Sequence, residues 1–333
     1  MSLRVRPPRT IAEVGEFGFL ARLLPRLPGA RDLIVGPGQD CAVISTRRGA
    51  WLITVDALVE HVHFERAWLS PRQLGRKSFL VNASDIAAMG GRPRFCVVSL
   101  GVPRTYLARD LRALQAGIVA AAADCGASIV GGNLARADTL FVSIALLGNA
   151  PGRIVTRQGA RTGDLIFVTG TLGDAALGLR WLRGRTGPGK SAHSIRRFRL
   201  PSPRLQAGRL LVSRGLASSM VDVSDGLVQD LGHICTESRV GAEIQTESIP
   251  RSAAYRAAMG TDPALALRGG EDYELLCTVP ERHVKTLQRL APQLGCPLTC
   301  IGRITPGSGI GLRTSDGRTL SVQGGGYDHF RRS

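Results

Sequence analysis

The sequence of 333 residues contains few lysines and few aromatic residues. Only Lys77, Lys190 and Lys285 are lysine, so the formal net charge of +17 comes almost entirely from arginine. The arginines are scattered along the chain, and neither a base-stacking aromatic motif nor a zinc-finger pattern accompanies them. We attribute the charge to a compositional bias toward arginine, so a nucleic-acid partner is not expected. A basic surface would also suit small polyanionic substrates.

Long hydrophobic runs are also absent. The most apolar stretch, residues 113–130, is interrupted by Gln115 and Asp124, so no segment reaches the roughly 20 apolar residues that a membrane-spanning helix needs. The basic start, MSLRVRPPRT, is not followed by the apolar core of a signal peptide. We expect a cytoplasmic protein with no membrane association.

Cysteine is sparse, with seven residues spread along the chain and no C-x-x-C pair. Without an export signal, we expect the thiols to be reduced and mostly part of the core. Cys296 and Cys300 would supply half of a zinc site, but no second pair with suitable spacing follows. The sequence therefore does not predict a zinc centre.

Apolar residues make up 44% of the chain, which is enough for a packed interior. Alternating strand and helix patterns predict an α/β (α+β) fold with two domains, residues 1–150 and 151–333, because the chain is turn-rich at 150–163. Strands are predicted at 51–59, 95–102, 128–130, 141–148, 164–169, 220–223, 242–245, 273–279 and 298–304. Helices are predicted at 174–183, 203–214, 226–238 and 281–293, and another carries Leu107, Leu111, Leu114, Ile118 and Ala121 on one face.

The stretch GRTGPGKS, residues 184–191, matches the phosphate-loop pattern G-x-x-x-x-G-K-[ST]. That pattern binds nucleotide only when a strand leads into it and a helix begins at its Lys-Ser. Here a predicted helix precedes it, and a short arginine-rich segment ending at Pro201 follows. We interpret it as a surface loop between helices whose match to the pattern is accidental.

Acidic residues beside glycines or at strand ends give a more specific signal. They are Asp40, Asp56, Asp85, Asp222, Asp225, Glu271 and Asp272. Each one alone could be a helix cap or a turn residue. Together they supply the oxygen ligands that Mg²⁺ prefers when it carries a polyphosphate.

Seven segments, in this order, carry a family resemblance. They are GQDCA from Gly38, TVDALVEHVHF from Thr54, VNASDIAAMGG from Val81, GDLIFVTGTLGD from Gly163, DVSDGL from Asp222, GGEDYELL from Gly269 and GYDHF from Gly326. The chain resembles the thiamine-monophosphate kinase family, which belongs to the superfamily of aminoimidazole-ribonucleotide synthetase. The resemblance covers nearly the whole chain.

The resemblance implies a fold and an activity. The expected architecture is that of aminoimidazole-ribonucleotide synthetase, with an N-terminal dimerisation domain of sheet plus helices and a C-terminal α/β domain. Such a homodimer would phosphorylate thiamine monophosphate with ATP, using several Mg²⁺ ions and no phosphate loop. Because the attacking phosphate is already ionised, no residue is expected to act as a general base.

The resemblance also implies roles for individual residues. The metal-binding set would be Asp40, Thr54, Val55, Asp56, Asp85, Asn133, Asp222 and Asp225. The residues near ATP would be Gln115, Gly132, Asn133, Arg157 and Ser224, and those near thiamine phosphate would be His63, Glu271 and Tyr327. Lys77, in Gly-Arg-Lys, would either contact phosphate or be a surface lysine of a helix.

Four positions depart from the pattern common in that family. Gln39 replaces an aspartate, Val55 a threonine, His61 a glycine, and Asn133 an aspartate. Fewer carboxylates should weaken the binding of Mg²⁺. His61 and His63 would point to the same side of a strand, which also permits a zinc site, but the family position favours His63 as a substrate contact.

Two alternatives stay open. One is an enzyme of the same superfamily that acts with ATP on another small substrate, although the cysteines expected of its selenophosphate and hydrogenase-maturation branches are missing. The other is a catalytically weakened relative that binds nucleic acid through its basic surface.

Overall fold

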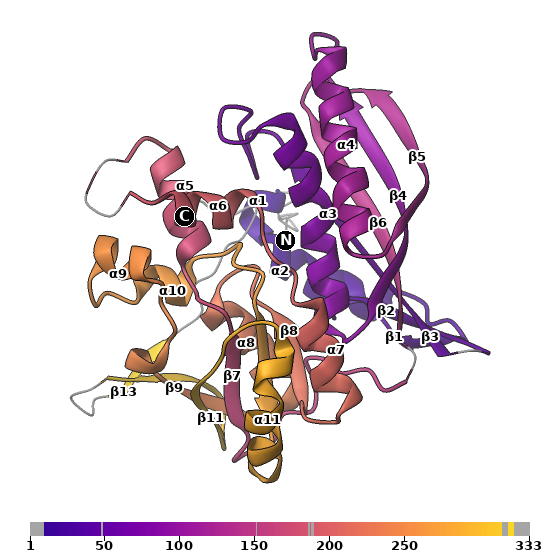
Figure 1. Ribbon diagram of the computed structural model, residues 1–333. Coiled ribbons are helices and arrows are strands. Elements are labelled where there is room, and N and C mark those ends of the chain that lie inside the picture. Colours follow the sequence, from indigo (N-terminus) through magenta and orange to yellow (C-terminus); the bar gives the residue numbers. More distant parts are fainter. Residues whose placement is uncertain are drawn as a thin grey trace, which may run out of the picture.

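The computed structural model describes residues 10–322 apart from 48, 151, 186, 188, 189 and 315–318. The described chain forms two sheets, one in each half, with helices packed against them (Figure 1). Each half therefore combines sheet and helix, as expected from the α/β (α+β) pattern. No helix within the described residues is both long enough and apolar enough to cross a bilayer.

The first half contains a six-stranded sheet in the order β1-β2-β3-β6-β4-β5. All neighbours are antiparallel except β4 and β5, which are parallel. The strands are β1 (Leu33–Val35), β2 (Ala42–Thr46), β3 (Gly49–Val59), β4 (Arg92–Val102), β5 (Ser128–Arg136) and β6 (Phe141–Ala150). The helices are α1 (Ile11–Val14), α2 (Glu16–Leu23), the 3₁₀ helix η1 (Leu24–Arg26), α3 (Pro71–Ala88) and α4 (Ala108–Asp124).

Helices α3 and α4 pack closely against each other. A Cβ on Gly75 of α3 would lie 2.0 Å from the carbonyl oxygen of Leu114, and one on Gly117 of α4 would lie 2.1 Å from that of Arg72. Only glycine permits such contact between the two helix backbones. At the start of α3, Ser70 Oγ accepts a hydrogen bond from Gln73 N, and Gln73 Oε1 accepts one from Ser70 N, which forms a capping box.

The first sheet has one face covered by α3 and one face less buried. In β3, Leu52, Thr54 and Leu58 are buried, whereas Val55 between them has 63% of its surface exposed. This alternation follows from the two-residue period of a strand. The covered face holds the hydrophobic core of this half, including Phe79, Ile86, Ile144 and Leu146.

The second half contains a seven-stranded sheet in the order β13-β12-β9-β11-β7-β10-β8. Its strands are β7 (Leu165–Thr169), β8 (Ser219–Asp222), β9 (Gly241–Gln245), β10 (Leu275–Val279), β11 (Leu298–Thr305), β12 (Gly309–Arg313) and β13 (Thr319–Val322). The α-helices are α5 (Asp174–Leu182), α6 (Ala192–Arg199), α7 (Leu205–Ser213), α8 (Leu227–Ser238), α9 (Ala253–Met259), α10 (Ala264–Arg268) and α11 (Val284–Leu290). The 3₁₀ helices are η2 (Thr246–Ser248), η3 (Glu281–His283) and η4 (Ala291–Leu294).

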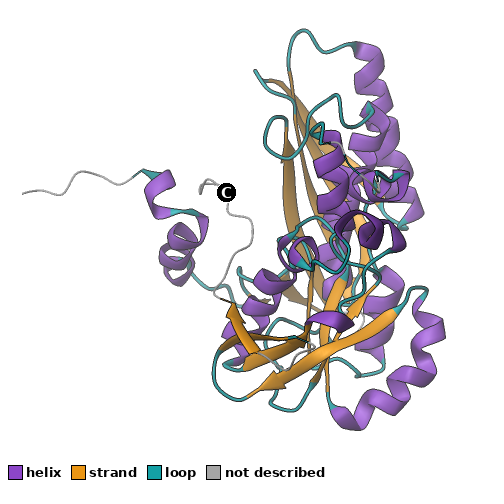
Figure 2. Cartoon of the chain, turned by 90° about the vertical axis from the view of Figure 1, so that its left-hand side faces the viewer, coloured by secondary structure: helices purple, strands orange, loops and turns teal. Residues whose placement is uncertain are grey.

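This second sheet is covered on both faces. Ile166 and Val168 of β7 belong to a core shared with α8, whereas Phe167 belongs to a core shared with α7 and α11. Burial on both faces explains why the strand reads as a continuous apolar run. Figure 2 shows the helices lying to the sides of the strands in both halves.

Helix α3 joins the two halves. It contacts β3 and β6 of the first sheet, and also α7 and β8 of the second half. Its residues from Leu74 to Ala88 are almost all buried although many are polar or small. Because α3 is buried and contacts both halves, its polar side chains lie at the junction between the halves, where a site can form.

The predicted strands and long helices are present, with ends shifted by a few residues. Strand β5 is longer than predicted and continues through Gly131, Gly132 and Asn133 to Arg136. The arginine-rich segment after residue 190 forms the helix α6, which sequence reasoning missed. The six-stranded sheet ends at Ala150 and the next strand begins at Leu165, but the domain boundary near residue 150 stays a prediction.

Candidate active site

A cavity of about 530 Å³ lies between the two halves of the chain. The first half contributes β3, the turn after it and α3, and the second half contributes the loops before α8 and β10. Its polar lining residues include Asp56, His63, Asp85, Ser224, Asp225 and Glu271. The structure therefore brings six of the predicted site residues to one cavity.

Strand β3 and helix α3 form one wall of this cavity. Thr54 Oγ1 donates a hydrogen bond of 2.5 Å to Asp85 Oδ2, and the backbone N of Asp56 donates one of 2.9 Å to Asn82 Oδ1. Thr54 and Asp56 point to the covered face of the sheet because they are two residues apart. Asp85 lies within α3, so its alternative interpretation as a helix cap is wrong.

Two further aspartates complete a buried acidic group. Asp222, at the end of β8, accepts a hydrogen bond of 2.6 Å from Ser84 Oγ of α3. Asp40, before β2, accepts two hydrogen bonds at its Oδ1, from Nη2 (2.6 Å) and Nε (3.1 Å) of Arg157. Asp40 Oδ2 is buried and has no hydrogen-bond partner among the described residues.

The four carboxylates Asp40, Asp56, Asp85 and Asp222 repel one another. Burial raises the pKa of Asp85 well above its usual value, and the charges of the other three raise it further. Burial and then the charge of Asp40 raise the pKa of Asp222 to about 8. Like charges at buried positions need a counter-ion or protons. The orphaned Asp40 oxygen and the all-oxygen donor set fit a hard divalent cation such as Mg²⁺.

The loops of the second half are held by unusual backbone contacts. Asp230 Oδ2 of α8 accepts hydrogen bonds of 3.1 Å from three successive backbone nitrogens, those of Ser224, Asp225 and Gly226. Helix α8 has Gly226 at its N-cap position and no side-chain cap. The alternative that Ser224 or Asp225 caps the helix is therefore wrong. Asp230 shapes the loop that carries both residues into the cavity.

The second of these loops is GGEDYELL. Glu271 and Tyr273 have positive φ angles of 69° and 51°, which are costly for residues other than glycine. Their backbone N–H groups donate to Ser224 O (2.7 Å) and Val223 O (2.8 Å). As a result, Glu271 and Tyr273 line the cavity, while Asp272 between them accepts hydrogen bonds from Gly173 N and Ala175 N at the start of α5.

Three predicted residues lie elsewhere in the chain. Gln115 is exposed on α4, and Gly132 and Asn133 lie on the exposed edge strand β5. The strand register places Asp56 of β3 opposite Ile144 of β6, which lies opposite Val98 of β4, which lies opposite Gly132 of β5. Strand β5 is therefore three strand spacings, or about 14 Å, from β3. Within one chain, Asn133 does not join the carboxylate group. These three assignments stay predictions, and Tyr327 is outside the described residues.

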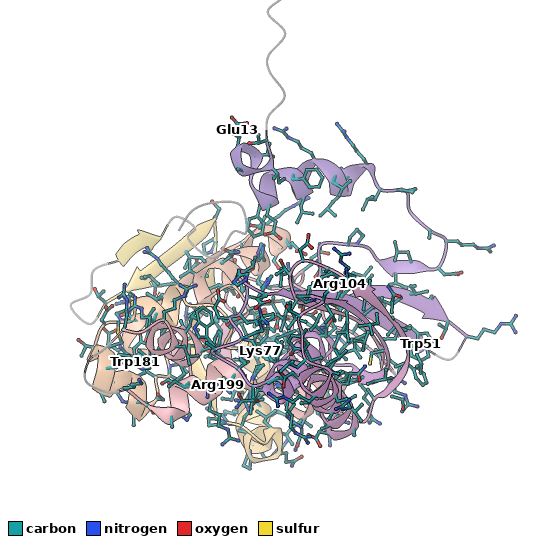
Figure 3. The ribbon with its side chains drawn as sticks, turned by 90° about the horizontal axis from the view of Figure 1, so that it is seen from above. Glu13, Trp51, Lys77, Arg104, Trp181 and Arg199 are labelled. Atoms are coloured by element: carbon teal, nitrogen blue, oxygen red, sulfur yellow. The ribbon has the colours of Figure 1, made fainter. Side chains whose placement is uncertain are left out.

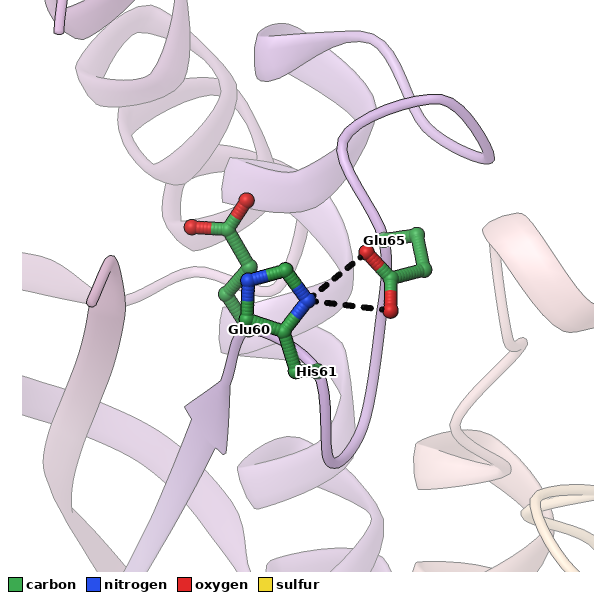
Figure 4. Close-up of side chains that lie close together, drawn as sticks. All are labelled: Glu60, His61 and Glu65. Atoms are coloured by element: carbon green, nitrogen blue, oxygen red, sulfur yellow. Dashed lines mark hydrogen bonds and ion pairs between the residues drawn. The ribbon is translucent and has the colours of Figure 1, made fainter.

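The expectation that His61 and His63 point to the same side of a strand is wrong. Strand β3 ends at Val59, and His61 has a positive φ of 68°, so the two imidazoles do not share one side of a strand. His63 lines the cavity, where its Nδ1 accepts a hydrogen bond of 3.1 Å from Val59 N. His61 instead pairs with Glu65, 3.0 Å from its Nδ1, beside Glu60 (Figure 4).

Glu60, His61 and Glu65 have ligand atoms within 4.8 Å of one another. Both carboxylate oxygens of Glu60, however, accept hydrogen bonds, one from Arg66 Nε and the other from Leu140 N at 3.3 Å. We therefore assign no metal to this group. Val55 of the predicted metal set has its side chain on the less buried face of the sheet, so only its backbone carbonyl would serve as a ligand.

The segment GRTGPGKS lies between α5 and α6, as expected, and three of its residues are outside the described part of the chain. A helix does begin after Ser191, whose Oγ accepts a hydrogen bond from His193 N. The element before the segment is a helix and not a strand, so the context of a phosphate loop is missing. None of its described residues lines the cavity.

Several supporting residues had no clear signal in the sequence. Glu274 is fully buried and accepts hydrogen bonds from Arg197, Arg204 and Thr169. This group ties α6 and α7 to the loop that carries Glu271.

Comparisons with known proteins agree with this geometry. The family model "AIR synthase related protein, N-terminal domain" matches residues 38–150, and "AIR synthase related protein, C-terminal domain" matches residues 161–315. The thiamine-monophosphate kinase of Escherichia coli K12 is 38% identical over 95% of this chain and 98% of its own length. That of Bacillus subtilis is 34% identical over 95% and 99%.

Solved structures give the same result. The structure described as "AaThiL complexed with AMPPCP and TMP" has a TM-score of 0.84 and 33% identity, covering 97% of this chain and 100% of its own. A thiamine-monophosphate kinase from Stenotrophomonas maltophilia has a TM-score of 0.75 and 37% identity, covering 90% and 95%. The chain therefore belongs to the AIR synthase related proteins and, within them, to the thiamine-monophosphate kinase family.

Proposed function

We propose that this protein transfers the γ-phosphoryl group of ATP to the phosphate of thiamine monophosphate, which gives thiamine diphosphate and ADP. The observation that carries the proposal is the group of four mutually repelling carboxylates at the cavity between the halves, of which Asp40 and Asp222 are buried and Asp56 and Asp85 are half-buried. Such a group has no stabilising role without cations, and phosphoryl transfer between two polyanions requires them. The family membership supports the same substrates.

The residues that would hold Mg²⁺ are Asp40, Asp56, Asp85, Asp222 and Asp225, with the hydroxyl of Thr54 beside them. When bound, Mg²⁺ would neutralise the phosphates and help to position them. Several ions are expected, because five carboxylates exceed what one Mg²⁺ uses together with substrate phosphates. The predicted ligands Val55 and Asn133 are not needed for this set within one chain.

The chain's own residues orient the reactants. Arg157 is held by Asp40 and by the carbonyl oxygen of Gly38, 3.2 Å from its Nη1, so its charge is fixed close to the acidic group. Four predicted residues line the cavity: Ser224, which we assign to ATP, Asp225, which we assign to a metal ion, and His63 and Glu271, which we assign to thiamine phosphate. Since the acceptor phosphate is already ionised, the residues need only hold it in line with the γ-phosphate.

The substitution at Gln39 has a structural role. Its Oε1 accepts a hydrogen bond of 2.8 Å from the backbone N of Arg157, and its Nε2 donates to Glu237. Gln39 thus ties the loop of Asp40 to the second half without adding a negative charge. We propose that the protein keeps its activity despite this departure from the common family pattern.

We also propose a homodimer formed through the less buried face of the first sheet. Val55, Phe95, Val97 and Val130 are exposed on or near this face, and β5 is an open edge. Exposed apolar residues next to each other on a sheet mark an interaction surface. Asn133 would then lie at the interface between the two chains.

The experiment is incubation of the purified protein with ATP, Mg²⁺ and thiamine monophosphate, with the products separated by chromatography. Thiamine diphosphate and ADP should appear in equal amounts. Unphosphorylated thiamine is the control acceptor and should give no thiamine diphosphate. If no thiamine diphosphate forms at any Mg²⁺ concentration, the proposed function is wrong.

A further inference from the structure

Lys77 of α3 is a fully buried lysine between the two halves (Figure 3). Its Nζ donates a hydrogen bond of 3.1 Å to Glu271 Oε2. Among the described residues, Glu271 is the ion-pair partner of Lys77. Burying an ammonium group without a partner is very unfavourable. Lys77 therefore depends on Glu271 for its charge, and its interpretation as a surface lysine is wrong.

The ammonium group of Lys77 is held from a second side. Its Nζ lies 3.6 Å from the centre of the Phe198 ring of α6, which is itself fully buried. The ring face attracts the cation and leaves it little freedom to move. Phe198 also contacts Trp68 edge to face, 6.1 Å between ring centres, and Trp68 lines the cavity. The position of Nζ is thus fixed by packing as well as by charge.

Glu271 is held at its backbone and at its side chain by different partners. Its backbone has the strained φ of 69° and is fixed by the hydrogen bond to Ser224 O. Its side chain has 23% of its surface exposed and lines the cavity, whereas Lys77 does not line it. Of the two side chains that hold the ammonium group, those of Glu271 and Phe198, that of Glu271 lines the cavity.

We propose that Lys77 is a positioning residue, which fixes the orientation of the Glu271 carboxylate for binding of thiamine phosphate. This inference rests on the proposed function, in which Glu271 contacts that substrate. A carboxylate on a strained loop has many side-chain conformations, and one hydrogen bond from a fixed ammonium group selects among them. Lys77 bonds the side chain of Glu271, whereas the loop of Ser224, which we assign to ATP, is held by Asp230 and by backbone hydrogen bonds, so ATP binding should depend little on Lys77.

The test compares Lys77→Met, Glu271→Gln and the double variant, with steady-state kinetics for both substrates. Each single variant should raise the KM for thiamine monophosphate on the order of tenfold or more, and change the KM for ATP by less than about threefold. The double variant should resemble Glu271→Gln alone, because Lys77 acts through Glu271. Lys285→Met, at an exposed lysine, is the control and should behave as the original protein.

The outcomes separate this inference from the proposed function. If Glu271→Gln leaves the KM for thiamine monophosphate unchanged, the role proposed for Glu271 is wrong. If Glu271→Gln raises that KM and Lys77→Met does not, or if the two effects multiply in the double variant, the positioning role is overturned. Lys77→Gln, which keeps a hydrogen-bond donor without a charge, is measured in parallel in case Lys77→Met does not fold. A rise in both KM values together would indicate a general structural role and also overturn the inference.

Discussion

Replacing Asp222 by Asn should stabilise the metal-free protein. Burial and Asp40 raise the pKa of Asp222 to about 8, whereas in the unfolded chain it is close to 4. At pH 7 the folded form must therefore take up a proton that the unfolded form does not hold. Each pH unit above 4 lowers the free energy of unfolding by about 1.4 kcal/mol, so at pH 7 it is lowered by about 4 kcal/mol. The value does not depend on the native pKa as long as that pKa exceeds 7.

The sign of the pH dependence follows from the raised pKa. The stability contributed by protonated Asp222 is fully present below pH 4 and is lost as the pH rises from 4 to 8. Asn does not titrate, so the advantage of Asp222→Asn should grow across this window. Replacing Asp222 also removes a charge that raises the pKa of Asp85, so the effect on Asp85 has the same sign and adds to the advantage of the variant.

The assay is thermal unfolding in EDTA and in excess Mg²⁺ between pH 5 and 8. In EDTA at pH 7 the Asp222→Asn variant should unfold several degrees above the original protein. In Mg²⁺ the order should reverse or the gap should close, because the variant loses a ligand. A variant that is less stable than the original in EDTA at pH 7, or equally stabilised by Mg²⁺, would refute the reasoning about this carboxylate group.

Two other predictions concern regions outside the cavity. Lys190→Ala should leave ATP turnover within about twofold of the original, since Lys190 does not line the cavity. A large loss in a coupled ADP assay would reopen the phosphate-loop interpretation. Val97→Glu places a charge on the proposed dimer face, where Val97 is 41% exposed, and should convert the dimer to a monomer in light scattering. Val119→Glu, at a valine of α4 that is 56% exposed, should leave the dimer intact, and a monomeric original protein would contradict the proposed interface.

The sequence predicted most of the fold because its signals were local. The strand around residues 51–59 alternates, and helix α4 carries Leu114, Ile118 and Ala121 on its buried face. The helix α6 was missed because its arginines gave no apolar period. Its two buried residues, Ser194 and Phe198, acquire their role only through contacts with α5 and α3.

Most carboxylates of the candidate site carried a local signal, because they end a strand or lie near a glycine; Asp85, inside α3, stood out only through the segment VNASDIAAMGG. Their partners carried no such signal. Lys77 and Glu271 are 194 positions apart, and Ser84 and Asp222 are 138 apart. Such pairs depend on how the halves meet, which no local pattern encodes. The same holds for Asp230. It reads in the sequence as an ordinary helix residue, but its carboxylate accepts hydrogen bonds from three backbone groups.

The measurement that tests the account most directly is turnover of Asp85→Asn across a range of Mg²⁺ concentrations. Asp85 lines the cavity, accepts a hydrogen bond from Thr54, and its pKa is raised by burial and by the charges of Asp56, Asp222 and Asp40. The variant should fold, since Asn keeps the acceptor for Thr54, but should form no thiamine diphosphate at any Mg²⁺ concentration. Asp124→Asn, which breaks the exposed ion pair with Arg76, should retain activity. Unchanged formation of thiamine diphosphate by Asp85→Asn would contradict a mechanism built on metal-binding carboxylates.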